Sequence, residues 1–326
     1  MTVRMIIDTD GGVDDAVALW WALDEPDVEV IGITVVAGNV DVAQATRNVC
    51  RVLHAHGSSH VPVFQGASRP LAGAPSLRPA DFIHGSDGLG DCGVPDAPFG
   101  AQQRSALEFL ADAGRAEPGA LCIVTLGPLT NIAAAILADR LWSTTVGALT
   151  VMGGVVGLQG NAQPMAEANV AHDPSAAGIV VRAPWVRPPL MVPLDATHVA
   201  TFGPDEFGVI ERRSNAASVF LHGPLTTYRR FAGTFCPPGE CPCHDLLAVM
   251  GAVHEDVLVV EEIPLAVQAS PGPAWGATIA DRRVSYFARS GTDGEQAVPE
   301  GFHPWRIATS AHTNAFRVRV RRLFGD

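Results

Sequence analysis

The chain has 326 residues, 47% of them hydrophobic, and a formal net charge of −12. The acidic balance argues against a nucleic-acid or anionic-membrane partner, and no run of residues is long and apolar enough to span a bilayer. The first four residues lead directly into an apolar segment and leave no room for a signal peptide. We therefore expect a cytoplasmic protein whose six cysteines are free thiols.

Short apolar runs alternate with helical patterns along the first two thirds of the chain. Strands are expected at residues 3–7, 28–37, 61–64, 121–125, 149–152 and 185–192. Helices are expected at residues 15–23 and 41–56 and in a segment that opens at Pro128. This alternation predicts an α/β fold with an open, mostly parallel, doubly wound sheet and helices on both faces. Because no clean boundary interrupts the pattern, we expect one domain over residues 1–326.

The last third of the chain has a different pattern. Residues 216–231 are expected to form a helix that Gly223-Pro224 kinks or breaks. A further helix restarts near Asp245. Beyond it, strand-like runs at residues 257–260, 264–269, 284–287 and 316–323 predict a small antiparallel C-terminal addition.

Four carboxylates crowd the corner between the first strand and the first helix. They belong to Asp8, Asp10, Asp14 and Asp15, which flank Gly11-Gly12. Two unit charges about 4 Å apart at an effective dielectric of about 20 repel by roughly 4 kcal/mol, whereas a helix N-terminus offsets only about 0.3–1 kcal/mol per acid. Capping the helix needs one or two acids, not four. We therefore expect a bound cation, and oxygen donors favour calcium or magnesium over zinc.

Further polar residues follow other strands. Asn39, like Asp10, falls at a strand end, where the ligands of doubly wound folds gather. Asn161, Glu167 and Asn169 share a loop after a later strand, and such a set suits a polyhydroxy ligand, although ordinary turns use the same residues. His84 lies in the middle of the long loop 66–98, where it either lines a site or is exposed.

Several motifs occur in a telling order: M-I-I-D-T-D-G-G-V-D-D-A, A-G-N, L-G-P-L-T-N, M-G-G, N-x-x-x-x-x-E-x-N and H-D-L-L-A-V. In this order the chain resembles the inosine-uridine-preferring nucleoside hydrolase family, from residue 5 to about residue 250. The resemblance implies a calcium-dependent N-ribohydrolase that cleaves ribonucleosides to ribose and free base. It also implies a homodimer or homotetramer.

The resemblance assigns roles to particular residues. Calcium would be held by Asp10, Asp15, Asp245 and the backbone carbonyl of Leu126. The ribose would be held by Asp14, Asn39, Met152, Asn161, Glu167 and Asn169. Asp10 would act as general base on a calcium-bound water, and Asp8 would brace the loop. His244 or His84 would protonate the leaving base.

The chain also departs from the family pattern. Gly11 and Val13 stand where members often have Pro and His, and Ala168 stands where an aromatic residue often packs against the ribose. The insertion C-P-P-G-E-C-P-C precedes His244, where base contacts are expected. A preference for purines or pyrimidines is therefore not readable from the sequence.

Three other interpretations remain open at this point. One is a magnesium-dependent phosphatase of the haloacid-dehalogenase type, whose strand also ends in D-x-D-G with a nucleophilic first Asp. No later strand, however, supplies the basic residue and acidic pair that such a site needs. Another is a zinc-stabilised binding protein that uses Cys236, Cys241, Cys243 and His244, although thiolate sites usually have C-x-x-C spacing. The third is a catalytically inactive member of the family that binds metal or ribose.

Overall fold

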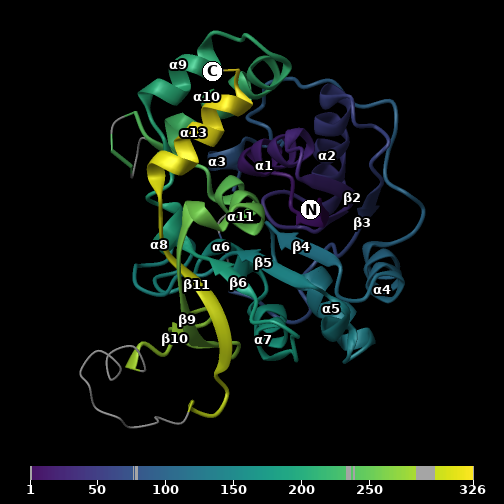
Figure 1. Cartoon of the computed structure of the whole chain (residues 1–326), viewed down its shortest axis with the longest axis vertical. Helices are drawn as coiled ribbons and strands as arrows, with labels where there is room; N and C mark the ends of the chain where they lie inside the picture. Colours follow the sequence, from purple (N-terminus) through teal and green to yellow (C-terminus); the bar gives the residue numbers. More distant parts are fainter. Residues whose placement is uncertain are drawn as a thin grey trace.

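The computed structural model describes residues 2–75, 77, 80–232, 236–237, 239–283 and 298–325. Within them, nine strands form one sheet in the order β10-β9-β11-β6-β5-β4-β1-β2-β3 (Figure 1). The strands are β1 (Val3–Thr9), β2 (Val28–Val35), β3 (Val63–Gln65), β4 (Leu121–Thr125), β5 (Ala148–Met152), β6 (Leu190–Val192), β9 (Leu258–Val267), β10 (Thr278–Ala280) and β11 (His303–Ala311). Two further short strands, β7 (Thr201–Phe202) and β8 (Cys241–Pro242), pair with each other.

The strands β3-β2-β1-β4-β5-β6 are all parallel. The chain winds from β1 outward to β3, returns to β4 beside β1, and then winds outward in the other direction. The winding therefore reverses between β1 and β4, and ligands of such sheets bind beyond the strand ends at this point. The doubly wound α/β prediction is confirmed, and the acidic corner lies at the reversal.

Both faces of the sheet are buried because its strands are apolar on both sides. In β1, Met5 and Ile7 belong to one hydrophobic cluster, whereas Ile6 belongs to the other. In β4, Val124 and Ile123 are divided in the same way. Because successive side chains of a strand point to opposite faces, each cluster lies on one face of the sheet.

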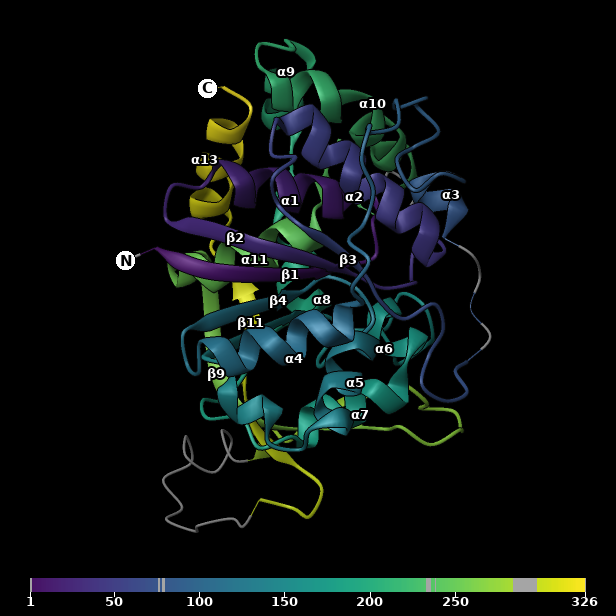
Figure 2. The same ribbon diagram turned by 90° about the vertical axis from the view of Figure 1, so that its right-hand side faces the viewer.

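Helices cover the two faces. They are α1 (Val13–Asp24), α2 (Val42–His56), α3 (Asp81–His84), α4 (Ala106–Ala116), α5 (Thr130–Ala138), α6 (Ala168–His172), α7 (Pro174–Arg182), α8 (Leu194–Thr197), α9 (Pro204–Glu211), α10 (Ala216–Ala232), α11 (His244–Val253) and α13 (Thr313–Leu323). In Figure 2, α1 and α2 lie on one side of β1, and α4, α5 and α7 lie on the other. Within the described part of the chain, no helix is long and apolar enough to cross a membrane.

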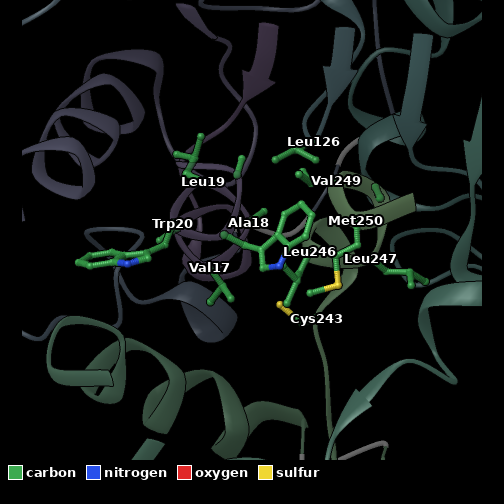
Figure 3. Packing of buried hydrophobic residues seen from close by; sticks show 14 of the residues in the cluster. Val17, Ala18, Leu19, Trp20, Leu126, Cys243, Leu246, Leu247, Val249 and Met250 are labelled. Carbon is green, nitrogen blue, oxygen red and sulfur yellow. The ribbon is translucent and has the colours of Figure 1, made fainter. Parts of the chain in front are cut away.

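Helix α11 packs against α1 in the centre of the larger cluster. Figure 3 shows Val17 and Ala18 of α1 close to Leu246 and Met250 of α11, and all four side chains are buried. Both helices are apolar around most of their circumference, as expected of helices inside a fold. Since α11 begins at His244, this packing brings Asp245 from late in the chain to the corner formed by its first residues.

The C-terminal region differs from the prediction in one element. Residues 316–323, expected to form a strand, belong to α13. Phe316, Val320 and Leu323 are buried, whereas Val318 is 40% exposed. Spacings of four and three residues place these side chains on one face of a helix. Their burial therefore favours a helix, although the alternating Arg and Val of the sequence are typical of a strand. The expected strand at 284–287 lies outside the described residues.

The antiparallel addition itself is confirmed by the pairing of β9 with β10 and with β11. The two runs expected at 257–260 and 264–269 form one strand, β9, and β11 was not foreseen. Strand β11 also pairs in parallel with β6, which joins the addition to the main sheet. Of the kink or break expected at Gly223-Pro224, the break does not occur, because α10 continues past Pro224.

Candidate active site

The corner between β1 and α1 is held by its own carboxylates. Asp15 accepts hydrogen bonds from the Thr9 hydroxyl, from the Gly12 N–H at 2.8 Å and from the Asp10 N–H at 3.3 Å. Gly11 has φ +72°, and a Cβ there would lie 2.7 Å from the Cα of Ala45 in α2. Glycine is therefore required twice at this position, for the backbone conformation and for the close approach of α2.

Asp10 and Asn39 are joined by two hydrogen bonds. The backbone N–H of Asn39 donates to Oδ2 of Asp10 at 2.9 Å, and Nδ2 of Asn39 donates to Oδ1 at 2.8 Å. The two residues follow neighbouring strands, as the sequence predicted. Burial, and next to it the Asp15 carboxylate, raise the pKa of Asp10 well above its usual value.

Three carboxylates converge on one point. Oxygen atoms of Asp14, Asp15 and Asp245 all lie within 4.8 Å of one another, and all three residues are buried. Burial and the Asp15 charge raise the pKa of Asp14 to about 7. Burial and the charges of the other corner acids raise the pKa of Asp245 well above its usual value. Oδ1 of Asp14 is buried without a hydrogen-bond partner. A buried acidic cluster with an unpaired oxygen fits a hard divalent cation.

A cavity of ≈ 540 Å³ lies over the corner and contains most of the predicted site. The predicted residues that line it are Asp14, Asn39, His84, Leu126, Met152, Asn161, Glu167, Asn169, His244 and Asp245. Asp10 and Asp15 do not line the cavity. Both are hydrogen-bonded to the side chain of Asn39, which does line it, and Nδ2 of Asn39 lies 3.5 Å from Oδ2 of Asp15. Among the described lining residues there is no arginine, and the whole chain has no lysine. The cavity thus suits a neutral or cationic ligand.

On one side of the cavity, a loop and α6 supply amide and carboxylate groups. Glu167 caps α6, with Oε1 accepting from the Asn169 N–H at 2.8 Å and Oε2 from the Gly154 N–H at 2.9 Å. Asn169 donates from Nδ2 to the carbonyl of Leu126 at 2.7 Å and to the carbonyl of Met152 at 3.2 Å. The predicted ribose residues and the predicted carbonyl ligand are thus connected.

Two histidines reach the cavity from other elements. Nδ1 of His84 accepts the backbone N–H of Val13 at 3.1 Å, and Nδ1 of His244 lies 2.7 Å from the hydroxyl of Thr197. Burial lowers the pKa of His84 to about 4 and that of His244 to about 3. Both imidazoles are therefore neutral at pH 7, and both have Nδ1 engaged, which leaves Nε2 for a ligand.

Several lining residues escaped the sequence prediction. Tyr228 of α10 donates from its hydroxyl to Oδ2 of Asp14 at 3.4 Å, and its ring lies 5.4 Å from that of His84. Phe82 and Phe231 meet edge-to-face at 5.1 Å, and His198 lies 5.6 Å from His244. These aromatic residues lie in a long loop and two helices without a recognisable motif, so the sequence carried no signal for them beyond their residue type.

Asp8 does not belong to the cavity. It is fully buried, and Oδ1 accepts hydrogen bonds from the hydroxyl of Thr34 and from Nδ2 of Asn131, the latter at 2.7 Å. This position fits the bracing role predicted for Asp8. It excludes the nucleophilic role that the phosphatase interpretation requires, because a substrate phosphate cannot reach a carboxylate held inside the sheet.

The zinc interpretation also finds no site. Within the described residues, the only three His, Cys, Asp or Glu side chains close enough to share a metal are Asp14, Asp15 and Asp245. Cys236, Cys241 and Cys243 are unpaired thiols, and burial raises the pKa of each. A raised pKa disfavours the thiolate form that binds zinc.

Comparisons with known proteins agree with this geometry. The sequence model of the inosine-uridine preferring nucleoside hydrolase family matches residues 5–317. A probable uridine nucleosidase 2 of Arabidopsis thaliana is 33% identical over 284 residues, 87% of each sequence. A plant nucleoside hydrolase structure superposes with a TM-score of 0.90 at 28% identity, covering 99% of both chains. A purine-preferring ribonucleoside hydrolase from Gardnerella vaginalis gives a TM-score of 0.86 at 31% identity, covering 99% of this chain and 98% of that one.

Proposed function

This chain belongs to the inosine-uridine preferring nucleoside hydrolase family and hydrolyses the N-glycosidic bond of ribonucleosides, and we propose that the acidic corner carries the reaction. The observation that supports the assignment most directly is the convergence of Asp14, Asp15 and Asp245, of which Asp14 and Asp245 line the cavity. The products are ribose and the free base. The phosphatase alternative is not favoured by the family match or by the buried position of Asp8.

The donor set fits the divalent cation on which the family depends, and we assign it as calcium. Its proposed ligands are Asp10, Asp15, Asp245 and the carbonyl of Leu126. Of these, Asp15 and Asp245 belong to the group of carboxylates within 4.8 Å of one another, whose third member is Asp14 and not Asp10. Oδ1 of Asp14 has no hydrogen-bond partner and is available beside them. When bound, the cation offsets the negative charge of the cluster and makes a nearby water more acidic. Oxygen donors without thiolate or imidazole support calcium over zinc.

Asp10 is the proposed general base. Its raised pKa gives it affinity for a proton, and the two hydrogen bonds from Asn39 fix both of its oxygens. It removes a proton from the attacking water as the water oxygen bonds to the anomeric carbon. The base leaves with the electron pair of the broken bond and takes up one proton from solvent. Asp10 then returns the proton that it received to solvent, so the net reaction is nucleoside and water giving ribose and free base.

The ribose is proposed to bind among the carboxylates and amides of the cavity. The proposed contacts are Asp14, Asn39, Met152, Asn161, Glu167 and Asn169. Positive charge develops on the ribosyl ring when a glycosidic bond breaks. Carboxylate and amide oxygens that are already in place before the reaction stabilise that positive charge. No arginine occurs among the described lining residues, so no guanidinium repels it.

His244 and His84 are the proposed donors to the leaving base. Because burial keeps both imidazoles neutral, each acts by donating a hydrogen bond from Nε2 to the base, and an imidazolium is not required. A neutral imidazole stabilises a developing negative charge in the same way in other enzymes. This refines the role of proton donor expected from the sequence.

The experiment that tests the function is a panel of ribonucleosides assayed for free ribose, with wild type, Asp10→Asn and metal-stripped enzyme. Wild type should release ribose, and the variant and the stripped enzyme should not, with activity returning when calcium is added. Turnover by Asp10→Asn at the wild-type rate would contradict the mechanism. Lack of ribose release by calcium-loaded wild type would support the inactive-member interpretation.

We also propose a cytoplasmic location and self-association as a homodimer or homotetramer. All six cysteines are free thiols, which supports a reducing compartment. Leu137, Leu141 and Val186 are 60%, 66% and 65% exposed, which supports a contact between copies of the chain. Sedimentation of the purified protein measures the oligomeric state.

A further inference from the structure

The two histidines of the cavity are held by partners of different kinds. The partner of His84 Nδ1 is the backbone N–H of Val13, which can only donate. The proton of neutral His84 must therefore be on Nε2. The partner of His244 Nδ1 is the hydroxyl of Thr197, which can either donate or accept. The tautomer of His244 thus depends on where the Thr197 hydroxyl directs its proton.

Thr197 occupies a restricted position. It is the last residue of α8 and is fully buried, and its backbone N–H donates to the carbonyl of Pro193 at 3.1 Å. Within the described residues, the only hydrogen-bond partner of its hydroxyl is Nδ1 of His244. Since no described residue other than His244 accepts from this hydroxyl, its proton is directed to Nδ1, because a buried hydroxyl that fails to donate loses a hydrogen bond.

We propose that Thr197 is a positioning residue that holds His244 in the Nε2–H tautomer, so that this nitrogen can donate to the leaving base. The inference rests on the function proposed for His244. If Nδ1 carried the proton, Nε2 would be a bare acceptor facing a base that is gaining electrons. The ring of the neighbouring His198 lies 5.6 Å from that of His244 and is tilted by 54° against it.

His84 and His244 are thus both in the Nε2–H tautomer, and a different partner fixes that tautomer in each. His84 depends on the backbone N–H of Val13, which only a proline at that position would remove, whereas His244 depends on one side-chain hydroxyl. The hydrogen-bond partners of metal-bound histidines typically contribute about 10–100-fold to activity, and we expect an effect of that order for the Thr197 hydroxyl. A substitution at Thr197 therefore isolates the orientation of His244 without altering its ring.

The test compares Thr197→Val, which replaces the hydroxyl by a methyl group, with Thr197→Ser, which retains it. The substrates are p-nitrophenyl riboside, whose phenolate leaves unaided, and whichever of inosine and uridine the wild type cleaves faster. For the nucleoside, Thr197→Val should lower kcat about 10–100-fold with little change in KM, and it should leave p-nitrophenyl riboside nearly unaffected. Thr197→Ser should restore most of the nucleoside activity.

The control is Thr46→Val, which removes another buried threonine hydroxyl, bonded to the Val42 carbonyl at 2.6 Å in α2. It should retain wild-type kinetics. Equal losses on both substrates in Thr197→Val, or a serine variant no better than the valine variant, would overturn the positioning role. If Thr197→Val fails to fold, the kinetics of Thr197→Ser and the NMR measurement of the wild-type tautomer, described next, test the positioning role.

The tautomer itself is measurable by ¹⁵N NMR of histidine-labelled calcium-bound protein, with the His244 signals identified by their absence in His244→Ala. The expected signature is a protonated Nε2 and an unprotonated Nδ1 in wild type, lost or mixed in Thr197→Val. A protonated Nδ1 in wild type would overturn the proposal. Wild-type nucleoside turnover by His244→Ala would instead contradict the function proposed for His244. The NMR spectrum would still show whether Thr197 sets the tautomer of His244.

Discussion

Asn39 holds both carboxylate oxygens of Asp10, one with its backbone amide at 2.9 Å and the other with its side-chain amide at 2.8 Å. The loop after β2 must therefore approach the end of β1 closely. It does so at Gly38, where a Cβ atom would collide with Oδ2 of Asp10. The orientation of the proposed general base thus depends on a residue that has no side chain.

Gly38→Ala should therefore lower kcat by displacing Asp10. A displacement of about 1 Å can cost on the order of 100-fold in rate, so a loss of that order is expected while the fold is retained. Gly100→Ala is the matched control, because a Cβ there meets nothing within 4 Å. Equal kcat values for the two variants would show that the close approach at Gly38 does not position Asp10.

Asp245 and His244 are adjacent in α11, but substituting them should have different effects on calcium binding and on hydrolysis. Asp245→Ala should weaken calcium binding and slow the hydrolysis of every substrate alike. His244→Ala should leave calcium binding nearly intact and slow natural nucleosides by roughly 10²–10³-fold, the usual cost of removing one hydrogen-bond donor to a developing negative charge, while sparing p-nitrophenyl riboside. Calorimetric titration with calcium and kcat on both substrates measure the difference. Equal losses on the two substrates in His244→Ala would make His84 the leading donor.

The sugar should be discriminated at its 2′-hydroxyl. If Asp14 and the cation bind that group, a 2′-deoxyribonucleoside leaves buried polar atoms unpaired, and such sites reject the analogue by as much as about 10⁴–10⁵-fold. The measurement is kcat/KM for matched ribo- and deoxyribonucleosides with the preferred base. Comparable values for the two would remove Asp14 from the proposed ribose contacts.

Asp8 should make stability depend on pH. Burial raises its pKa to about 7 from its ordinary value of 3.8, so the folded state binds a proton more tightly than the unfolded state. The stability from this group is present below pH about 4 and is lost as pH rises through about 7. The Asp8→Asn variant has no carboxyl to ionise and does not lose this stability. The difference in unfolding free energy, variant minus wild type, should therefore become more positive between pH 5 and pH 8. Urea unfolding at both pH values, with calcium saturating, measures the change, and a constant difference would contradict it.

The C-terminal helix offers a test of periodicity. In α13, Val320 is fully buried and Val318 is 40% exposed, whereas a strand would place both side chains on one face. Val320→Thr buries a hydroxyl and should cost about 1–3 kcal/mol of unfolding free energy, and Val318→Thr should change little. Equal losses in urea unfolding would favour the strand expected from the sequence.

The sequence predicted those features whose signals are local. The acids of the corner, the glycines between them and the apolar strand before them are adjacent in the chain, so both the site and the fold class could be inferred. Tyr228 could not be, because its contact with Asp14 depends on how α10 packs against α1 and α3. The helix at Thr313–Leu323 was missed for a similar reason, since Arg and Val alternate there and only the packing of Phe316 and Val320 selects the helical period.

The packing of α11 against α1 has a consequence for the order of folding. Asp14 and Asp15 are made early in synthesis and Asp245 late, yet their carboxylates lie within 4.8 Å of one another only when these two helices have docked. Contacts between such distant parts of a chain form late, because they require the closure of a long loop. A nascent chain that still lacks α11 also lacks Asp245, and therefore cannot offer a cation the complete set of proposed ligands. Capture of the ion therefore marks completed folding, and the ion then stabilises the finished molecule by binding only to it.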